Sequence, residues 1–168
     1  MLLPLAADAV AALGVLAQSQ TDVGSGLLGS AVATFLGTLI VGGIMVVAFT
    51  DYTRQRIREL REEPVGSLLY GLVALVALIV IMILLAITIV GILVVIPLAI
   101  VAYLLWIVGA AIAYVAIGDR LVGHEDGWLK PLLVGAAING VLVLTGIGGL
   151  VSFVIGAAGF GAVLRSWL

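Results

Sequence analysis

From residue 66 to residue 118 the chain contains no aspartate, glutamate, lysine, arginine or histidine. The stretch is too long for one helix across a hydrocarbon layer about 30 Å thick, and about right for two helices joined by a tight turn. Gly91, which follows Thr88, is the predicted turn. Pro97 falls in the second helix, where its missing N–H removes one backbone hydrogen bond and predicts a kink unless neighbours compensate.

The composition supports a membrane protein. Hydrophobic residues make up 64% of the chain, charged residues 10%, and the mean hydropathy is +1.41. A soluble domain of this composition could not bury so much apolar surface. The absence of cysteine excludes disulfides and thiolate metal sites. A net charge of −2 and basic residues that form no long stripe predict no nucleic-acid partner. We therefore expect an all-α, multi-pass protein of the cell (plasma) membrane, with membrane lipid as its main surroundings.

The apolar runs predict a polytopic bundle of five transmembrane helices, arranged as one span plus two tandem helical hairpins. The predicted segments are an external apolar or interfacial segment at 1–23, a first span at 24–50, a charged cytoplasmic helix at 51–64, and a membrane domain at 65–168 made of hairpins 66–118 and 131–165 and the cytoplasmic loop 119–130.

Two of these segments leave alternatives open. Residues 1–17 resemble a cleavable secretory signal but lack a basic start, and an external interfacial helix is the preferred interpretation. Residues 131–163 could form one long tilted helix, although Gly146, Gly148 and Gly149 would each cost about 1 kcal/mol inside it. As a hairpin, its two short spans either thin the bilayer or are partly shielded by the longer helices.

The basic residues support five crossings. With five spans, all seven lysines and arginines fall on one face of the membrane. This face is predicted to be cytoplasmic, because lysine and arginine near span ends tend to stay in the cytoplasm. The N-terminus is then outside and the C-terminus cytoplasmic. An even number of spans would scatter the charges over both faces.

Small residues on the helices predict where backbones approach closely, since lipid provides little hydrophobic drive between helices. They recur every four residues in the first span and form shorter versions in the third and fifth. The predicted packing residues are Gly26, Ser30, Thr34, Thr38 and Gly42, then Gly109 and Ala113, then Ser152 and Gly156. These surfaces pack within one chain or associate copies of it.

Polar residues within the spans are few. Asn139 is expected to bond to a neighbouring helix, and the hydroxyls of Thr88 and Thr145 to satisfy backbone groups at the two turns. No catalytic motif is present, His124 is expected to be a solvated loop residue, and we expect neither enzymatic activity nor a cofactor. The helix at 51–64 is expected to contact lipid headgroups or a partner, or to be a solvated linker. Its candidate contact residues are Arg54, Arg56, Arg58 and Arg61.

The two hairpins resemble the C-terminal membrane region of bactofilin-like, polymer-forming cytoskeletal proteins, without the β-helical domain of that family. The resemblance covers residues 65–168. The residues that carry it are the run 85–91 with Pro97 and Leu98, the run 118–121, the run 144–151 and the run 159–164. It implies a membrane anchor or scaffold with no catalytic residues.

We therefore expect a non-catalytic membrane protein that anchors or organises a partner, or an accessory subunit of a membrane-associated assembly. The expected partner is a second copy of the chain or another membrane or cytoskeletal protein. The alternative is a small oligomeric channel or passive transporter, with Asn139, Thr88 and Thr145 lining its path.

Overall fold

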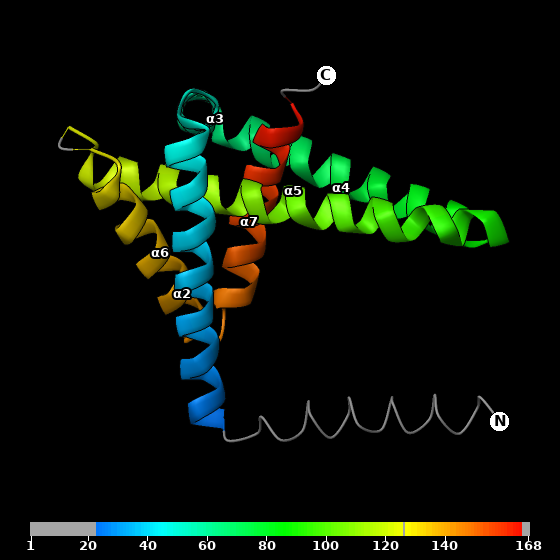
Figure 1. The fold of residues 1–168 in the computed structure, drawn as a ribbon, viewed down its shortest axis with the longest axis horizontal. Helices are drawn as coiled ribbons and strands as arrows, with labels where there is room; N and C mark the ends of the chain where they lie inside the picture. The colour runs from blue at the N-terminus through cyan, green and yellow to red at the C-terminus, as the bar shows by residue number, and fades with distance from the viewer. Residues whose placement is uncertain (1–22, 126, 166–168) are drawn as a thin grey trace.

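The computed structural model describes residues 23–125 and 127–165 (Figure 1). Within these residues the chain forms six helices and no strand, which confirms the all-α prediction. The helices are α2 (Val23–Ala48), α3 (Thr50–Glu62), α4 (Pro64–Ala86), α5 (Ile89–Val122), α6 (Leu129–Val143) and α7 (Gly148–Leu164). Nearly all of the predicted external segment 1–23 lies outside the described residues.

The charged helix α3 ends where the sequence predicts. Glu63 leaves the helical region, with φ −131° and ψ 64°, because the ring of Pro64 disfavours an α conformation in the residue before it. Pro64 then begins α4, where its missing N–H costs nothing because the first turn of a helix has free donors. The 13 residues of α3 therefore form a separate helix between two apolar ones.

The turn between α4 and α5 lies three residues earlier than Gly91. Thr88 caps α5, and its hydroxyl oxygen accepts a hydrogen bond from the Gly91 N–H at 2.9 Å. Gly91 is inside the helix, where a Cβ would lie 1.8 Å from the carbonyl oxygen of Leu85. The glycine therefore permits the close return of the chain rather than forming the turn. Helix α5 continues through Pro97 without a break.

The turn between α6 and α7 repeats this geometry. The Thr145 hydroxyl donates to the Leu142 carbonyl at 2.8 Å, as the Thr88 hydroxyl does to Leu85 at 3.0 Å. A Cβ on Gly148 would lie 1.5 Å from the Leu142 oxygen. Residues 144–147 separate the two helices, so the alternative of one long helix is excluded.

The helices diverge from a common end. In Figure 1, α2 runs across the long α4–α5 hairpin at a steep angle. We call α2 and the α4–α5 hairpin the apolar arms. Helices α6 and α7 fill the space where these two arms meet. Helix α7 packs on both α4 and α5, while α6 packs on both α2 and α5. Among the described helices, α2, α4 and α5 are long and apolar enough to cross a membrane, whereas α6 and α7 have only 15 and 17 residues.

The protein core surrounds the C-terminal half of α5. Ile112 is fully buried there and belongs to a cluster that includes Met45, Ile57, Leu132 and Val163. The far half of the α4–α5 hairpin is different, because its large apolar side chains are exposed: Leu84 is 61% exposed and Leu93 is 77% exposed. Exposing so many large apolar side chains to water would be unfavourable, whereas exposing them to the hydrocarbon of a membrane would not.

Three helix crossings rest on pairs of glycines that bring two backbones into contact. The pairs are Gly71 with Gly161 between α4 and α7, Gly109 with Gly159 between α5 and α7, and Gly118 with Gly135 between α5 and α6. A Cβ on Gly159 would lie 2.0 Å from the carbonyl oxygen of Gly109. The same distance separates a Cβ on Gly118 from the oxygen of Pro131. Any side chain at these positions would push the helices apart.

The predicted small-residue stripe of α2 is buried only at its C-terminal end. Thr38 and Gly42 are buried, but Thr34 and Gly26 are partly exposed and Ser30 is exposed. Four residues of an α-helix turn through roughly 400°, so a strict four-residue repeat drifts by roughly 40° at each step. This drift explains why only the C-terminal end of the stripe is buried within one chain, and the packing of its exposed part against another copy stays a prediction. The buried face instead follows Ala31, Thr38, Gly42 and Met45.

Candidate functional site

The charged residues gather at the end where the helices meet. Helix α3, the start of α4, the loop between α5 and α6 and the end of α7 all lie there (Figure 1). The basic residues at this end are Arg54, Arg56, Arg58 and Arg61 in α3, Arg120 in the last turn of α5, Lys130 in the first turn of α6, and Arg165 after α7. All seven lysines and arginines of the sequence are thus on one side of the apolar arms.

Asp119 is the centre of the first polar cluster. Its side chain is 1% exposed, accepts a hydrogen bond from Arg61 at 2.8 Å and lies in hydrogen-bond contact with His124 Nδ1. Gly123, with φ +67°, ends α5 and turns the chain so that His124 returns toward Asp119. A buried carboxylate needs such partners, because an uncompensated charge is costly away from water.

His124 is an exposed loop residue, as expected from the sequence, but its ring also has bonded and stacked partners. Its ring stacks on that of Trp128, with centroids 4.4 Å apart and planes 10° apart. The Arg54 guanidinium also lies over the Trp128 ring, 5.7 Å from its centroid, within the range of a cation–π contact. His124 and Trp128 thus attach the chain that follows α5 to both Asp119 of α5 and Arg54 of α3.

A cavity of about 650 Å³ opens between α3 and this loop. Three of the four candidate contact arginines line it, Arg54, Arg58 and Arg61. The opposite wall is formed by Asp119, His124 and Trp128. Sequence reasoning identified the arginines but missed this wall. The available signal was Asp119 directly after the long uncharged stretch, followed closely by the histidine and the tryptophan.

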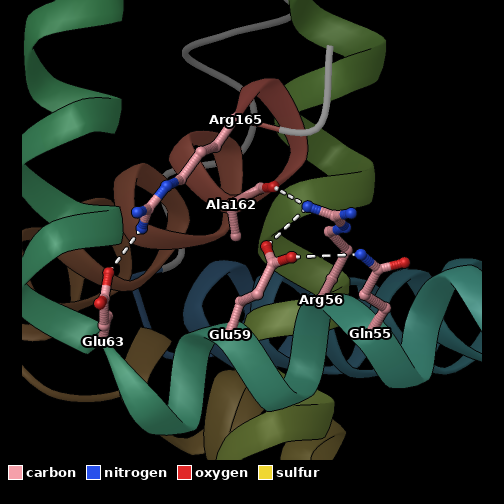
Figure 2. A network of polar contacts seen from close by, with 6 residues as sticks. All are labelled: Gln55, Arg56, Glu59, Glu63, Ala162 and Arg165. Atoms are coloured by element: carbon pink, nitrogen blue, oxygen red, sulfur yellow. Dashed lines mark hydrogen bonds and ion pairs between the residues drawn. The ribbon is translucent and has the colours of Figure 1, made fainter. Parts of the chain in front are cut away.

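Arg56 does not belong to this cavity. Its side chain is 6% exposed, pairs with Glu59 at 2.6 Å and donates to the carbonyl oxygen of Ala162 in α7 at 3.2 Å (Figure 2). The expected contact of Arg56 with lipid or a partner is therefore corrected to a contact inside the protein. On a helix, Arg56 points away from the face shared by the other three arginines.

Another ion pair joins the residue before α4 to the residue after α7. Arg165 donates to Glu63 at 2.7 Å, and Figure 2 shows this pair beside the Arg56 cluster. The hydrogen bond from Glu63 raises the pKa of Arg165 above its usual value. Both side chains are exposed, so water screens the interaction.

Several polar residues of the apolar helices and their turns bond to protein groups. Asn139 donates from α6 to the Thr38 hydroxyl of α2 at 2.7 Å, and Tyr114 donates from α5 to Ser152 of α7 at 2.9 Å. The predicted turn hydroxyls, Thr88 and Thr145, bond to carbonyl groups at the ends of the preceding helices. Each of these contacts fixes a turn or a helix pair.

The other predicted packing residues lie where α5 meets α7. Gly109 touches Gly159, and Ala113 is buried beside the same glycine. A Cβ on Gly156 would lie 2.7 Å from the Trp106 ring, which also contacts Phe160. Within the described residues, no group of three or more histidine, aspartate or glutamate side chains could hold a metal ion.

These features define a helical protein with apolar arms suited to a membrane and a folded, charged end. The chain belongs to the family described as a domain of unknown function (DUF8173), whose model matches residues 1–167. No curated protein and no solved structure matches it.

Proposed function

We propose that this chain is a non-catalytic, multi-pass protein of the plasma membrane that anchors or organises a partner, or is an accessory subunit of a membrane assembly. The observation that supports the proposal is the contrast between its two parts. Large apolar side chains are exposed along α2, α4 and the far half of α5, while charged side chains form a bonded cluster at one end. Lipid stabilises the first part and water the second.

The proposed topology has five crossings, with the charged end in the cytoplasm. Since α2 and the α4–α5 hairpin diverge from that end, both can cross when the membrane normal lies between them (Figure 1). Tilting also suits α5, whose 34 residues exceed the length that a straight crossing needs. Helices α6 and α7 are the two short crossings, shielded in part by the longer ones.

The contacts of the intramembrane polar groups favour an anchor over a channel. The Asn139 amide and the Thr38 hydroxyl bond to each other across α6 and α2, and the turn threonines bond locally. Groups that line a conducting path would instead face a water-filled space. The partner class that the resemblance implies is a polymer-forming cytoskeletal protein, and another copy of the chain is the second possibility.

The topology can be tested with single-cysteine variants, because the natural sequence contains no cysteine. Arg58→Cys and Lys130→Cys should react with a membrane-impermeant maleimide only after cells are permeabilised. Ile87→Cys and Ile147→Cys, at the two exposed hairpin turns, should react in intact cells. Labelling of Ile147→Cys from the same side as Arg58→Cys would refute the crossings by α6 and α7.

The anchoring role can be tested by mass determination of the complex after gentle detergent extraction from its native cells. The proposal predicts a particle heavier than one chain of 17.2 kDa with its detergent and lipid. A stable lone monomer under all extraction conditions would contradict assembly, while leaving the membrane topology intact.

A further inference from the structure

The arginines of the cavity share one face of α3. Arg54, Arg58 and Arg61 are spaced by four and three residues, so their side chains project in nearly the same direction. The adjacent face carries Ile57 and Leu60, which are 2% and 8% exposed and hold α3 against the protein core. Burial of that face fixes the orientation of α3 and directs the guanidinium groups into the cavity.

In the part of the chain that the structure describes, two of these guanidinium groups have no carboxylate partner. Arg61 pairs with Asp119, and Asp119 also holds His124. Arg54 stacks on Trp128, and across the ranges 23–125 and 127–165 neither Arg54 nor Arg58 makes an ion pair. Glu62 is the other acid that lines the cavity. With His124 neutral, the three arginines exceed the two carboxylates by one positive charge.

The walls of the cavity are held in place before any ligand binds. Asp119 fixes Arg61 and His124, and the stacked rings of His124 and Trp128 form a flat wall beside Arg54. A set of planar guanidinium groups in a fixed pocket suits the oxygens of a phosphate, which accept paired hydrogen bonds from arginine. Its volume of about 650 Å³ exceeds the space that one phosphate group needs and leaves room for a headgroup.

Exposed apolar side chains flank, in the sequence, the loop that contributes His124 and Trp128 to the cavity. Leu121 and Val122 precede its loop, Leu129 follows it, and all three are exposed. They belong to the last turn of α5 and the first turn of α6. A ligand with a phosphate and hydrocarbon chains could therefore place its phosphate among the arginines and its chains along these residues. A soluble phosphate compound would not use the second surface.

We propose that this cavity is a binding site for the phosphate headgroup of an anionic phospholipid of the cytoplasmic leaflet. Arg54 and Arg58 supply the unpaired charge, Arg61 completes the basic wall, and Trp128 borders the headgroup at the depth where amphipathic rings are stable. The inference rests on the membrane placement proposed above, and it adds a defined site to what would otherwise be diffuse attraction between arginines and the membrane surface.

The test uses the full chain in mixed micelles that contain equal amounts of phosphatidylglycerol and phosphatidylcholine. Native mass spectrometry then counts the lipids of each class that remain bound. We expect retention of one phosphatidylglycerol in preference to phosphatidylcholine. The double variant R54Q/R58Q should weaken this binding by roughly tenfold or more, because it removes two charge-assisted donors. The matched control R120Q removes an arginine from the same end of the protein but outside this cavity, and it should bind like the natural chain.

Two results would overturn the proposal. Equal losses in R54Q/R58Q and R120Q would show that charge alone, without a site, retains the lipid. Binding of inorganic phosphate to the natural chain, with no preference for phosphatidylglycerol over phosphatidylcholine, would assign the cavity to a soluble anion instead. In either case, insertion of the chain into the micelles remains a separate readout, so failure of the lipid site is distinguishable from failure of the membrane assignment.

Discussion

The contact between Gly109 and Gly159 provides the sharpest test of how the helices are held together. Gly159→Ala would place a methyl group 2.0 Å from the Gly109 carbonyl oxygen, whereas ordinary contact begins at 3.4 Å. The difference means that α5 and α7 must separate by about 1.4 Å at this point. The obstacle is backbone, which cannot rotate away as a flexible side chain can.

The size of the effect follows from two opposed terms. Overpacking of a close contact costs about 1–3 kcal/mol, and a clash with backbone belongs at the upper end. Replacing glycine with alanine inside a helix stabilises it by about 1 kcal/mol. The net loss is therefore about 2 kcal/mol, which lowers the melting temperature of a chain of this size by roughly 4–8 °C.

The assay is thermal unfolding in detergent micelles, followed by tryptophan fluorescence. Trp106 reports on this crossing directly, because its ring contacts Phe153 and Phe160 of α7. The matched control is Gly37→Ala in α2, where nothing lies within 4 Å of the new methyl group. It should melt at the same temperature as the natural chain or higher. If Gly159→Ala were as stable as Gly37→Ala, close backbone contact would not be what joins α5 to α7.

Three further substitutions test single contacts by thermal unfolding in the same micelles. Asn139→Ala should cost about 1 kcal/mol through loss of its hydrogen bond to Thr38; a double-mutant cycle with Thr38→Val that shows no coupling would contradict this. Gly91→Ala should destabilise the α4–α5 turn by about 1–3 kcal/mol, because its methyl group would lie 1.8 Å from the Leu85 oxygen. The control Gly146→Ala has open space around the new methyl group and should not destabilise the protein. Equal melting temperatures of the two variants would refute the role of Gly91. Asp119→Asn should cost about 1–3 kcal/mol, because it replaces the buried carboxylate that pairs with Arg61 by a neutral amide. The exposed Glu125→Gln should cause no change. A melting temperature equal to that of the natural chain would show that the charge of Asp119 does not hold the charged end together.

The two hairpin turns were visible in the sequence because their signal is local. Thr88 with Gly91, and Thr145 with Gly148, mark positions where a hydroxyl satisfies a backbone group and a glycine admits a carbonyl oxygen. Such contacts join residues close in the chain, so the residue types nearly specify them. The α4–α5 turn was placed at Gly91, three residues after its observed position at Thr88, because a glycine can permit the chain to return without forming the turn itself.

The glycine pairs show what residue spacing leaves open. Gly109 was identified as a packing residue from its spacing with Ala113, but its partner Gly159 was not, and neither were Gly71, Gly118 and Gly135. Glycine is abundant in this chain, with 22 residues, so its presence alone does not show which helix a glycine faces. That choice depends on crossing points between helices distant in the sequence.

The sequence by itself determined that the chain is helical, where most helices begin and end, and that charge is confined to one end, because hydropathy, proline and threonine–glycine turns act over a few residues. Only the tertiary structure decided that α2 and the α4–α5 hairpin diverge rather than run parallel, that Arg56 is buried while Arg54 and Arg58 face a cavity, and that Asp119 holds both Arg61 and His124. The physical reason is that these outcomes depend on which surfaces of distant helices meet, and that is set by close backbone contact at a few glycines rather than by the apolar character that nearly all of these helices share.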